Sequence, residues 1–297
     1  MRASSISASR SGADLPPPRA ATPRRTRLRR RWRALRRRWR RWRPRARRAW
    51  RWLRAAPPPL QVLASVATIL LIFAALNLAY HVMRKPTEMF FPVAGALNKL
   101  PAETWRQYGP LFRANATIAI TPELLAALAQ VEAAGNPVAR TYWRWRFSWN
   151  PFEIYQPASS AVGMYQMTDG AFAEARRYCI HDHRVVEDGP WHDWRSCWFN
   201  ALYTRIVPSH AVELTAASLD RTVADILQRR GIAAATPQQS QDLAALIHLC
   251  GAGAADGFAR RGFRLAPGQR CGDHAAAAYL AQVNAMKRLF ARLAAAE

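Results

Sequence analysis

The chain has 297 residues and a formal net charge of +25, with 44 Lys and Arg residues against 19 Asp and Glu residues. Residues 1–54 contain 21 Arg residues and a single acid, Asp14, so this segment carries +20 and leaves +5 for the rest. The excess of basic residues is therefore largely confined to one segment. It gives no reason to predict a folded nucleic-acid-binding domain.

Residues 1–56 are predicted to be a disordered, Arg- and Trp-rich cytoplasmic tail. Ser, Ala, Pro and Arg dominate residues 1–31, and such a stretch cannot bury enough apolar surface to offset its ordering entropy. Beyond it, Trp residues alternate with Arg, a mixture that suits anionic lipid headgroups at a membrane interface. The same mixture can stack on and neutralise a nucleic acid; the lipid interpretation is favoured by the segment that follows.

Residues 60–82 form an uncharged run of 23 residues. As a helix, at ~1.5 Å per residue, this run is long enough to cross a bilayer. It is longer than the apolar core of a cleaved signal peptide and lies further from the start of the chain, so it is predicted to be a transmembrane signal anchor. The Arg-rich side should stay in the cytoplasm, which places the C-terminal part outside.

The four cysteines, Cys179, Cys197, Cys250 and Cys271, all follow the apolar run. An even count in an exported domain predicts disulfides, and of the three possible pairings we favour Cys179–Cys197 and Cys250–Cys271, which close the shortest loops. Zinc is the alternative, because several metal-ligating residues lie between the first two cysteines, but their spacing matches no established zinc pattern. No metal or cofactor is predicted. The intervening residues are His181, Asp182, His183, His192 and Asp193.

Residues 86–116 are interpreted as a juxtamembrane linker with one short helix near 104–113, and residues 117–297 as the folded domain. Thr121, Pro122 and Glu123 give the N-terminal signature of a helix that Gly135-Asn136-Pro137 ends. No segment has a strand pattern, so the fold class is all-α. Further helices are expected at 169–179, at 194–230 with a bend at Pro208, at 238–250 and at 275–295, with loops at 181–193 and at Gly251, Gly253 and Gly257.

Glu132 is the main candidate for catalysis. Leu125, Leu128 and Glu132 share one face of the predicted helix, and that face is apolar. Burial and the negative end of the helix dipole both favour the neutral carboxylic acid, which is the form a proton donor to a glycosidic oxygen needs. The aromatic segment 140–157 that follows has side chains suited to the apolar faces of sugars, although core packing would also account for several of them.

Two motifs resemble those of lytic transglycosylases with a soluble-lytic-transglycosylase-type domain, which have a lysozyme-like fold. Glu132-Ala133-Ala134-Gly135-Asn136-Pro137 resembles the catalytic motif, with Ala133 in place of the usual Ser. Residues 160–167, Ser-Ala-Val-Gly-Met-Tyr-Gln-Met, resemble the second motif. The third motif is degenerate: residues 247–253 stand in its place, with His248 at the position of its Tyr, and the separation of the first two motifs is longer than is typical.

The resemblance implies a site in which Glu132 acts as the single acid/base and several residues bind substrate. Gly163 would let the backbone approach a sugar, or would simply form a tight turn; Gln166 would bind an acetamido group, or would lie on the surface; Tyr279 would match a late substrate-side Tyr. Met164 and Tyr165 would line the cleft or fill the core, and the core is favoured for Met164. The implied substrate-binding residues are Ser160, Gly163, Met164, Tyr165, Gln166, His248 and Tyr279.

The implied reaction cleaves the β-1,4 bond between N-acetylmuramic acid and N-acetylglucosamine and leaves a 1,6-anhydro end. The expected partners are peptidoglycan strands, the bacterial inner membrane, anionic headgroups bound by the tail, and an envelope-spanning assembly; no nucleic acid is expected. A hydrolytic muramidase, which needs a second carboxylate, and a glycan-binding scaffold of a secretion or conjugation apparatus are the alternatives. A nucleic-acid-binding membrane protein is a third.

Overall fold

The structure is a computed structural model that describes residues 44, 48, 50–90, 92–190, 192, 193 and 195–297. It is mostly helical, with 61% helix and 9% strand. The chain divides into two compact units, Met1–Phe73 and Ala74–Glu297. Most of the predicted disordered tail, together with Trp32, Trp39 and Trp42, lies outside the described residues.

Helix α2, Pro58–Arg84, contains the predicted transmembrane run. It is long and apolar enough to cross a membrane. Its apolar side chains are exposed on every side rather than buried along one stripe; Leu63, Ile69 and Leu71 are 65%, 65% and 71% exposed. A surface helix of a globular domain would bury one of its faces.

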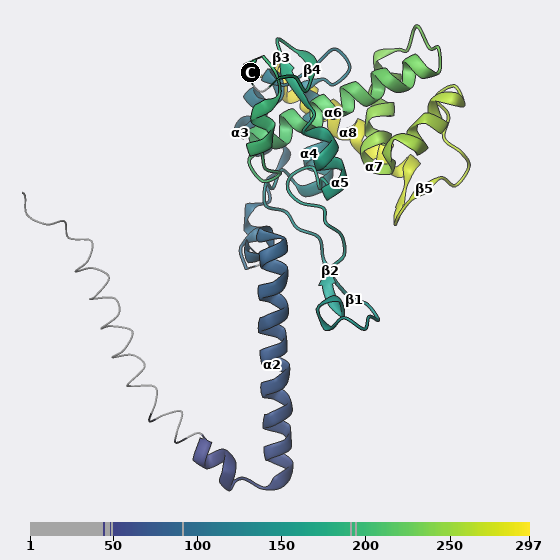
Figure 1. The fold of residues 1–297 in the computed structure, drawn as a ribbon. Coiled ribbons are helices and arrows are strands. Elements are labelled where there is room, and N and C mark those ends of the chain that lie inside the picture. Colours follow the sequence, from purple (N-terminus) through teal and green to yellow (C-terminus); the bar gives the residue numbers. More distant parts are fainter. Residues whose placement is uncertain (1–43, 45–47, 49, 91, 191, 194) are drawn as a thin grey trace, which may run out of the picture. The chain divides into compact units, whose positions relative to one another are not determined.

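The second unit is built around α4, Pro122–Ala133 (Figure 1). Leu124, Leu125 and Leu128 are fully buried in its core. Thr121 caps α4, since its hydroxyl accepts the amide of Leu124 at 3.4 Å, as its sequence signature predicts. The other long helices of the unit are α3, Pro101–Ala114, α6, Pro208–Arg229, α7, Pro237–Arg260, and α8, Ala276–Ala295.

The short helix predicted near 104–113 is present as α3, but residues 86–116 pack against the second unit more closely than a linker would. Two short 3-10 helices, Pro86–Phe90 and Ala94–Leu97, lead into α3. The buried side chains of α3 are Trp105, Tyr108 and Phe112, which belong to the main core. They lie at i, i+3 and i+7 and so form an apolar stripe, while the charged residues between them face solvent.

The all-α prediction is confirmed for the bulk of the unit, but three short antiparallel hairpins were missed. Strand β1, Trp143–Trp145, pairs with β2, Tyr155–Pro157. Strand β3, Tyr178–His181, pairs with β4, Arg184–Glu187. The third pair consists of two-residue strands, β5, Arg270–Cys271, and β6, His274–Ala275. Segments this short carry too little alternation to be recognised in a sequence.

Three predicted helices have different bounds in the structure. The helix predicted at 169–179 is α5, Asp169–Ala175, because the residues after it join β3. No helix continues into Pro208; a 3-10 turn, Trp198–Leu202, precedes it, and α6 starts at Pro208, a residue that suits the first helical position. Helix α7 continues beyond 250 to Arg260, with a break at Gly251 in place of the predicted loop.

Candidate active site

Glu132 lies in the last turn of α4 with a side chain that is 18% exposed. The helix ends directly after it, because Ala134 and Gly135 adopt left-handed conformations with φ of 49° and 65°. A Cβ atom at Gly135 would lie 2.3 Å from the hydroxyl oxygen of Thr104 in α3. Both the backbone conformation and the lack of space for a Cβ atom therefore require glycine at this position. Gly135 thus helps to determine where α4 ends, directly after Glu132.

The Asn136 side chain anchors the turn that follows. It is buried, and its amide donates to the carbonyl of Ala94 at 2.5 Å and to Oδ1 of Asn98 at 2.8 Å, while its own Oδ1 accepts the amide of Val138. The Gly-Asn-Pro stop is thus bound to the segment that precedes α3. Lys99 donates to the carbonyl of Gly135 at 3.3 Å, so that a cation lies at the negative end of the α4 dipole.

Two side chains from distant helices meet the Glu132 carboxyl group. The hydroxyl of Tyr279 in α8 donates to Oε1 at 2.5 Å. His248 Nε2 in α7 lies 3.7 Å from the same oxygen. Burial raises the pKa of Tyr279 far above its usual value, and the neighbouring Glu132 adds to the rise. Tyr279 therefore keeps its proton and remains a donor whether Glu132 is an acid or a carboxylate.

A cavity of about 420 Å³ opens beside Glu132. Among the described residues that line it, Glu132 supplies the one carboxyl group. Arg140 brings a cation to its wall, and Asn98 and Tyr142 add groups capable of hydrogen bonding. Tyr142 belongs to the aromatic segment that the sequence suggested for sugar binding. Asn98 and Arg140 were not predicted, because Asn98 fell in the predicted linker and Arg140 had only its charge and its nearness to the first motif as a signal.

A second, smaller cavity of about 180 Å³ is lined by His248, Gln166 and Glu174, among others. His248 thus belongs to this cavity and also approaches Glu132, which lines the larger one. Gln166 has an unusual positive φ of 46°, and its side-chain amide donates to the carbonyls of Gly163 at 2.9 Å and Ala139 at 3.3 Å. Its side chain consequently braces the second motif against the chain that follows Glu132.

Other residues of the second motif have structural contacts. Ser160 Oγ accepts the amide of Asp169 at 3.1 Å, at the start of α5. Gly163 has a φ of 82°, and a Cβ atom there would lie 2.3 Å from the carbonyl oxygen of Arg205. The close approach that requires this glycine is made by the protein's own backbone.

Met164 and Tyr165 lie in the core, the alternative favoured for Met164, and not in the substrate-binding position that the resemblance implied. They are 0% and 1% exposed and belong to the main core, and the Tyr165 hydroxyl donates to the carbonyl of Leu125 in α4. Side chains that no solvent reaches cannot contact a substrate in this conformation, so their role is packing. A short motif without periodicity gave no sign of which way these side chains point.

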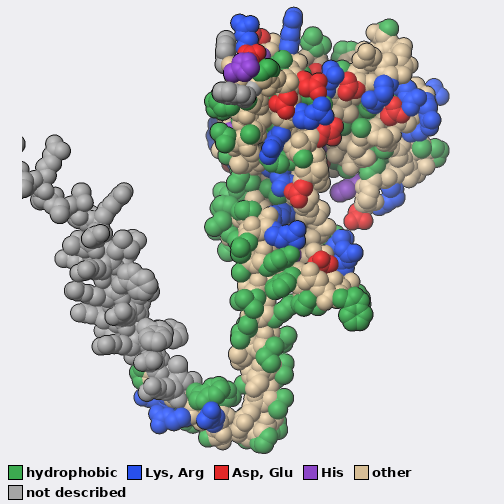
Figure 2. All heavy atoms as spheres, viewed as in Figure 1, with side chains coloured by type: hydrophobic (Ala, Val, Ile, Leu, Met, Phe, Trp, Pro, Cys, Tyr) green, Lys and Arg blue, Asp and Glu red, His purple; other side chains and the backbone are tan. Residues whose placement is uncertain are grey.

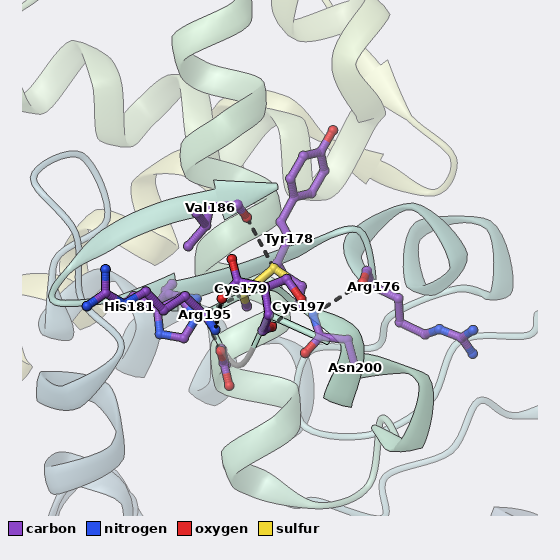
Figure 3. Close-up of a disulfide and its surroundings, with 12 residues drawn as sticks. Arg176, Tyr178, Cys179, His181, Val186, Arg195, Cys197 and Asn200 are labelled. Atoms are coloured by element: carbon purple, nitrogen blue, oxygen red, sulfur yellow. Dashed lines mark hydrogen bonds between the residues drawn. A yellow bond between two sulfur atoms is a disulfide. The ribbon is translucent and has the colours of Figure 1, made fainter. Parts of the chain in front are cut away.

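Both predicted disulfides are present. Cys179 joins Cys197 with a Cα–Cα distance of 5.4 Å, and Cys250 joins Cys271 with a distance of 5.2 Å. Figure 3 shows the first of them. Beside it, the Asn200 side chain donates to the backbone carbonyls of Tyr178 and Arg176, in the segment that contains Cys179. The second disulfide begins two residues after His248 and therefore fixes one flank of the Glu132 site. Within the described ranges, no group of three or more His, Cys, Asp or Glu side chains is arranged to hold a metal ion.

Comparisons with known proteins add no assignment. No protein-family model, curated protein or solved structure matches the chain.

Proposed function

We propose that the chain is a membrane-anchored peptidoglycan lytic transglycosylase with a lysozyme-like catalytic domain and Glu132 as its single acid/base. The observation that carries the proposal is a carboxyl group in the last turn of a helix whose middle is buried and apolar, beside an open cavity and hydrogen-bonded to a buried tyrosine. The ordered succession of the two motifs and the meeting of Glu132, His248 and Tyr279 also support it.

In the proposed reaction, the protonated Glu132 gives its proton to the glycosidic oxygen as the bond to the muramyl C1 breaks. The muramyl C6 hydroxyl then attacks C1 and returns its proton to Glu132, so that a 1,6-anhydro ring forms and no water is consumed. A nucleophile supplied by the substrate removes the need for a second carboxylate. Tyr279 holds Oε1 throughout and leaves Oε2 to face the substrate.

We further propose that α2 crosses the inner membrane once, with the Arg-rich segment in the cytoplasm and the second unit in the periplasm. The length and apolar surface of α2, the charge asymmetry around it and two disulfides support this topology. Protease added to spheroplasts should digest the second unit of the full chain. Protection of that unit until the membrane is dissolved would contradict the topology.

The activity is tested with the full chain in detergent micelles, incubated with purified peptidoglycan, and with mass spectrometry of the released fragments. We expect anhydro-muramyl ends, and a loss of at least about a hundredfold in Glu132→Gln, because that variant cannot donate or accept the proton. Glu123→Gln is the matched control, because Glu123 lies in the first turn of the same helix, away from the cavity. Reducing ends would establish a hydrolase instead, and binding without release would establish a scaffold.

A further inference from the structure

The hairpin formed by β1 and β2 is attached to the last turns of α2. Asn77 donates its side-chain amide to the carbonyl of Tyr155 at 2.7 Å, and His81 Nε2 meets the carbonyl of Phe152 at 2.9 Å. The Phe152 ring also stacks on Tyr80, with centroids 4.7 Å apart. These contacts hold the returning strand of the hairpin beside the C-terminal end of the apolar helix (Figure 1).

The two polar side chains of α2 that make these contacts are buried. Asn77 and His81 are 2% and 7% exposed, on a helix whose apolar side chains are mostly exposed. A polar side chain at this position would be costly in hydrocarbon unless it found a hydrogen-bonding partner. The carbonyl groups of the hairpin act as that partner. The hairpin therefore lies level with the last two turns of α2.

A buried carboxylate ties the base of the hairpin to the same place. Glu88, directly after α2, is 1% exposed and accepts the indole N–H of Trp143 at 2.7 Å. It also pairs with Lys85 at 3.3 Å and Arg140 at 3.2 Å. Because a buried carboxylate is costly to leave unpaired, these contacts make the attachment of the hairpin rigid.

The tip of the hairpin exposes three large aromatic side chains. Trp145, Phe147 and Trp149 are 73%, 107% and 104% exposed, and Arg144 and Arg146, on either side of Trp145, are exposed as well. Figure 2 shows hydrophobic and basic side chains together on this arm. None of these five side chains lines the Glu132 cavity, so the prediction from sequence that the aromatic segment binds sugar fits Tyr142 and not the tip.

Three polar side chains of the turn, Ser148, Asn150 and Glu153, hydrogen-bond within it. Glu153 accepts from Ser148 Oγ at 2.9 Å and from Asn150 Nδ2 at 3.2 Å, and Asn150 Oδ1 accepts the amide of Phe152. A turn that directs its polar groups inward and its aromatic rings outward is suited to leaving water, because its own hydrogen bonds persist there.

We infer that this arm, residues 141–158, is a second membrane-contact element. Trp145, Phe147 and Trp149 enter the headgroup region of the leaflet from which α2 emerges, and Arg144 and Arg146 contact lipid phosphates. The inference depends on the proposed crossing of α2. It selects lipid over glycan because five side chains fix the arm to the end of the apolar helix: Asn77, Tyr80, His81, Lys85 and Glu88.

The arm also determines where the active site can work. Arg140, Thr141 and Tyr142, at the start of the arm, line the Glu132 cavity. Attachment to the membrane at two points prevents the second unit from rotating about α2, and it keeps the cavity at a fixed height close to the membrane surface. The glycan within reach is therefore the layer nearest the membrane.

The test places the photoreactive residue p-benzoylphenylalanine at one position of the full chain, reconstituted in vesicles of phosphatidylethanolamine and phosphatidylglycerol. Position 147 probes the arm and position 71, on α2, probes the proposed crossing. Position 118 is the matched control, since Ile118 is 99% exposed but lies in a loop beside the turn between β3 and β4, where His183 meets the carbonyl of Ala116. Mass spectrometry of the irradiated protein identifies what each position has captured.

We expect lipid adducts at 71 and 147 in comparable yield, and about tenfold less at 118. Lipid adducts at 71 alone would overturn the role of the arm and leave the crossing of α2 intact. Absence of lipid at both 71 and 147 would overturn both. Capture at 147 of a second copy of the chain, or of glycan when peptidoglycan is added, in place of lipid would also overturn the inference.

Discussion

The hydroxyl of Tyr279 donates a hydrogen bond to Oε1 of Glu132, across 147 residues of sequence. The contact joins α8 to the end of α4, the pair of helices at the centre of the second unit. It holds Oε1 of the carboxyl group that lines the larger cavity. The first two predictions concern this bond.

Replacing Tyr279 with Phe should lower the rate of anhydro-muropeptide release by about tenfold to a hundredfold, because a hydrogen bond to a charged group is worth roughly 1.5–3 kcal/mol. Tyr165→Phe is the matched control. It removes a hydroxyl that donates to the carbonyl of Leu125 in the core and does not contact Glu132. It should cost stability, about 1 kcal/mol, and leave the rate unchanged. Equal losses of rate in the two variants would contradict the proposed role of Tyr279.

Stability should fall above pH 10 in a way that depends on Tyr279. Its pKa is raised in the folded chain, mainly by burial, so above pH 10 the unfolded chain loses this proton while the folded chain keeps it. The unfolded state then binds fewer protons, and the free energy of unfolding decreases as pH rises. Denaturant titrations between pH 9 and pH 11 should show a shallower decrease for Tyr279→Phe, by up to about 1.4 kcal/mol per pH unit for one group. The same slope in both proteins would contradict the assignment.

The two disulfides should differ in their effect on activity. Each closes a loop of similar length, with separations of 18 and 21 residues, so removing either pair by Cys→Ala should cost about 3 kcal/mol of stability. Loss of Cys250–Cys271 should in addition lower the rate at a temperature where the variant is still folded, because Cys250 lies two residues from His248. Loss of Cys179–Cys197 serves as the control. Equal residual rates in the two folded variants would mean that the second disulfide does not position the site.

Gly251 should be the least replaceable glycine of α7. It breaks the helix with φ 77° and ψ 168°, a conformation open almost only to glycine, and it has free space around its Cα. Gly251→Ala should therefore cost about 1–3 kcal/mol from backbone strain alone. Gly253→Ala, two residues on and equally unobstructed, should be neutral or slightly stabilising because its φ is ordinary. Thermal unfolding of the two variants measures the difference, and equal midpoints would show that the break relaxes.

Local signals in the sequence were sufficient for some elements. Thr121, Pro122 and Gly135 determine the ends of α4 by capping and by conformational freedom, which depend on a few neighbouring residues. The run at 275–295 has strong helical periodicity and matches α8 within one residue. The disulfide pairing followed from loop length and was confirmed.

Features set by tertiary packing were not predictable in the same way. Trp105 and Phe112 are fully buried, yet the charged residues around them resembled a linker. Tyr165 points into the core and Gln166 does not, a difference decided by the positive φ of Gly163 and Gln166. Of the candidate site, the resemblance named Glu132, His248 and Tyr279 individually, and the structure brings them together. Asn98 and Arg140 reach the cavity only because distant segments fold together.

The hydrogen bonds of Asn136 to Ala94 and Asn98 have a consequence for how the chain can be divided. The residues that leave the apolar helix also form a wall of the Glu132 cavity, so the proposed anchor and the proposed active site share one stretch of polypeptide. On that proposal, proteolysis within this stretch would not release an active soluble fragment, because the fragment would lack part of the wall of its own cavity. A variant with a different membrane anchor would have to keep residues 86–114, because these residues form part of the second unit.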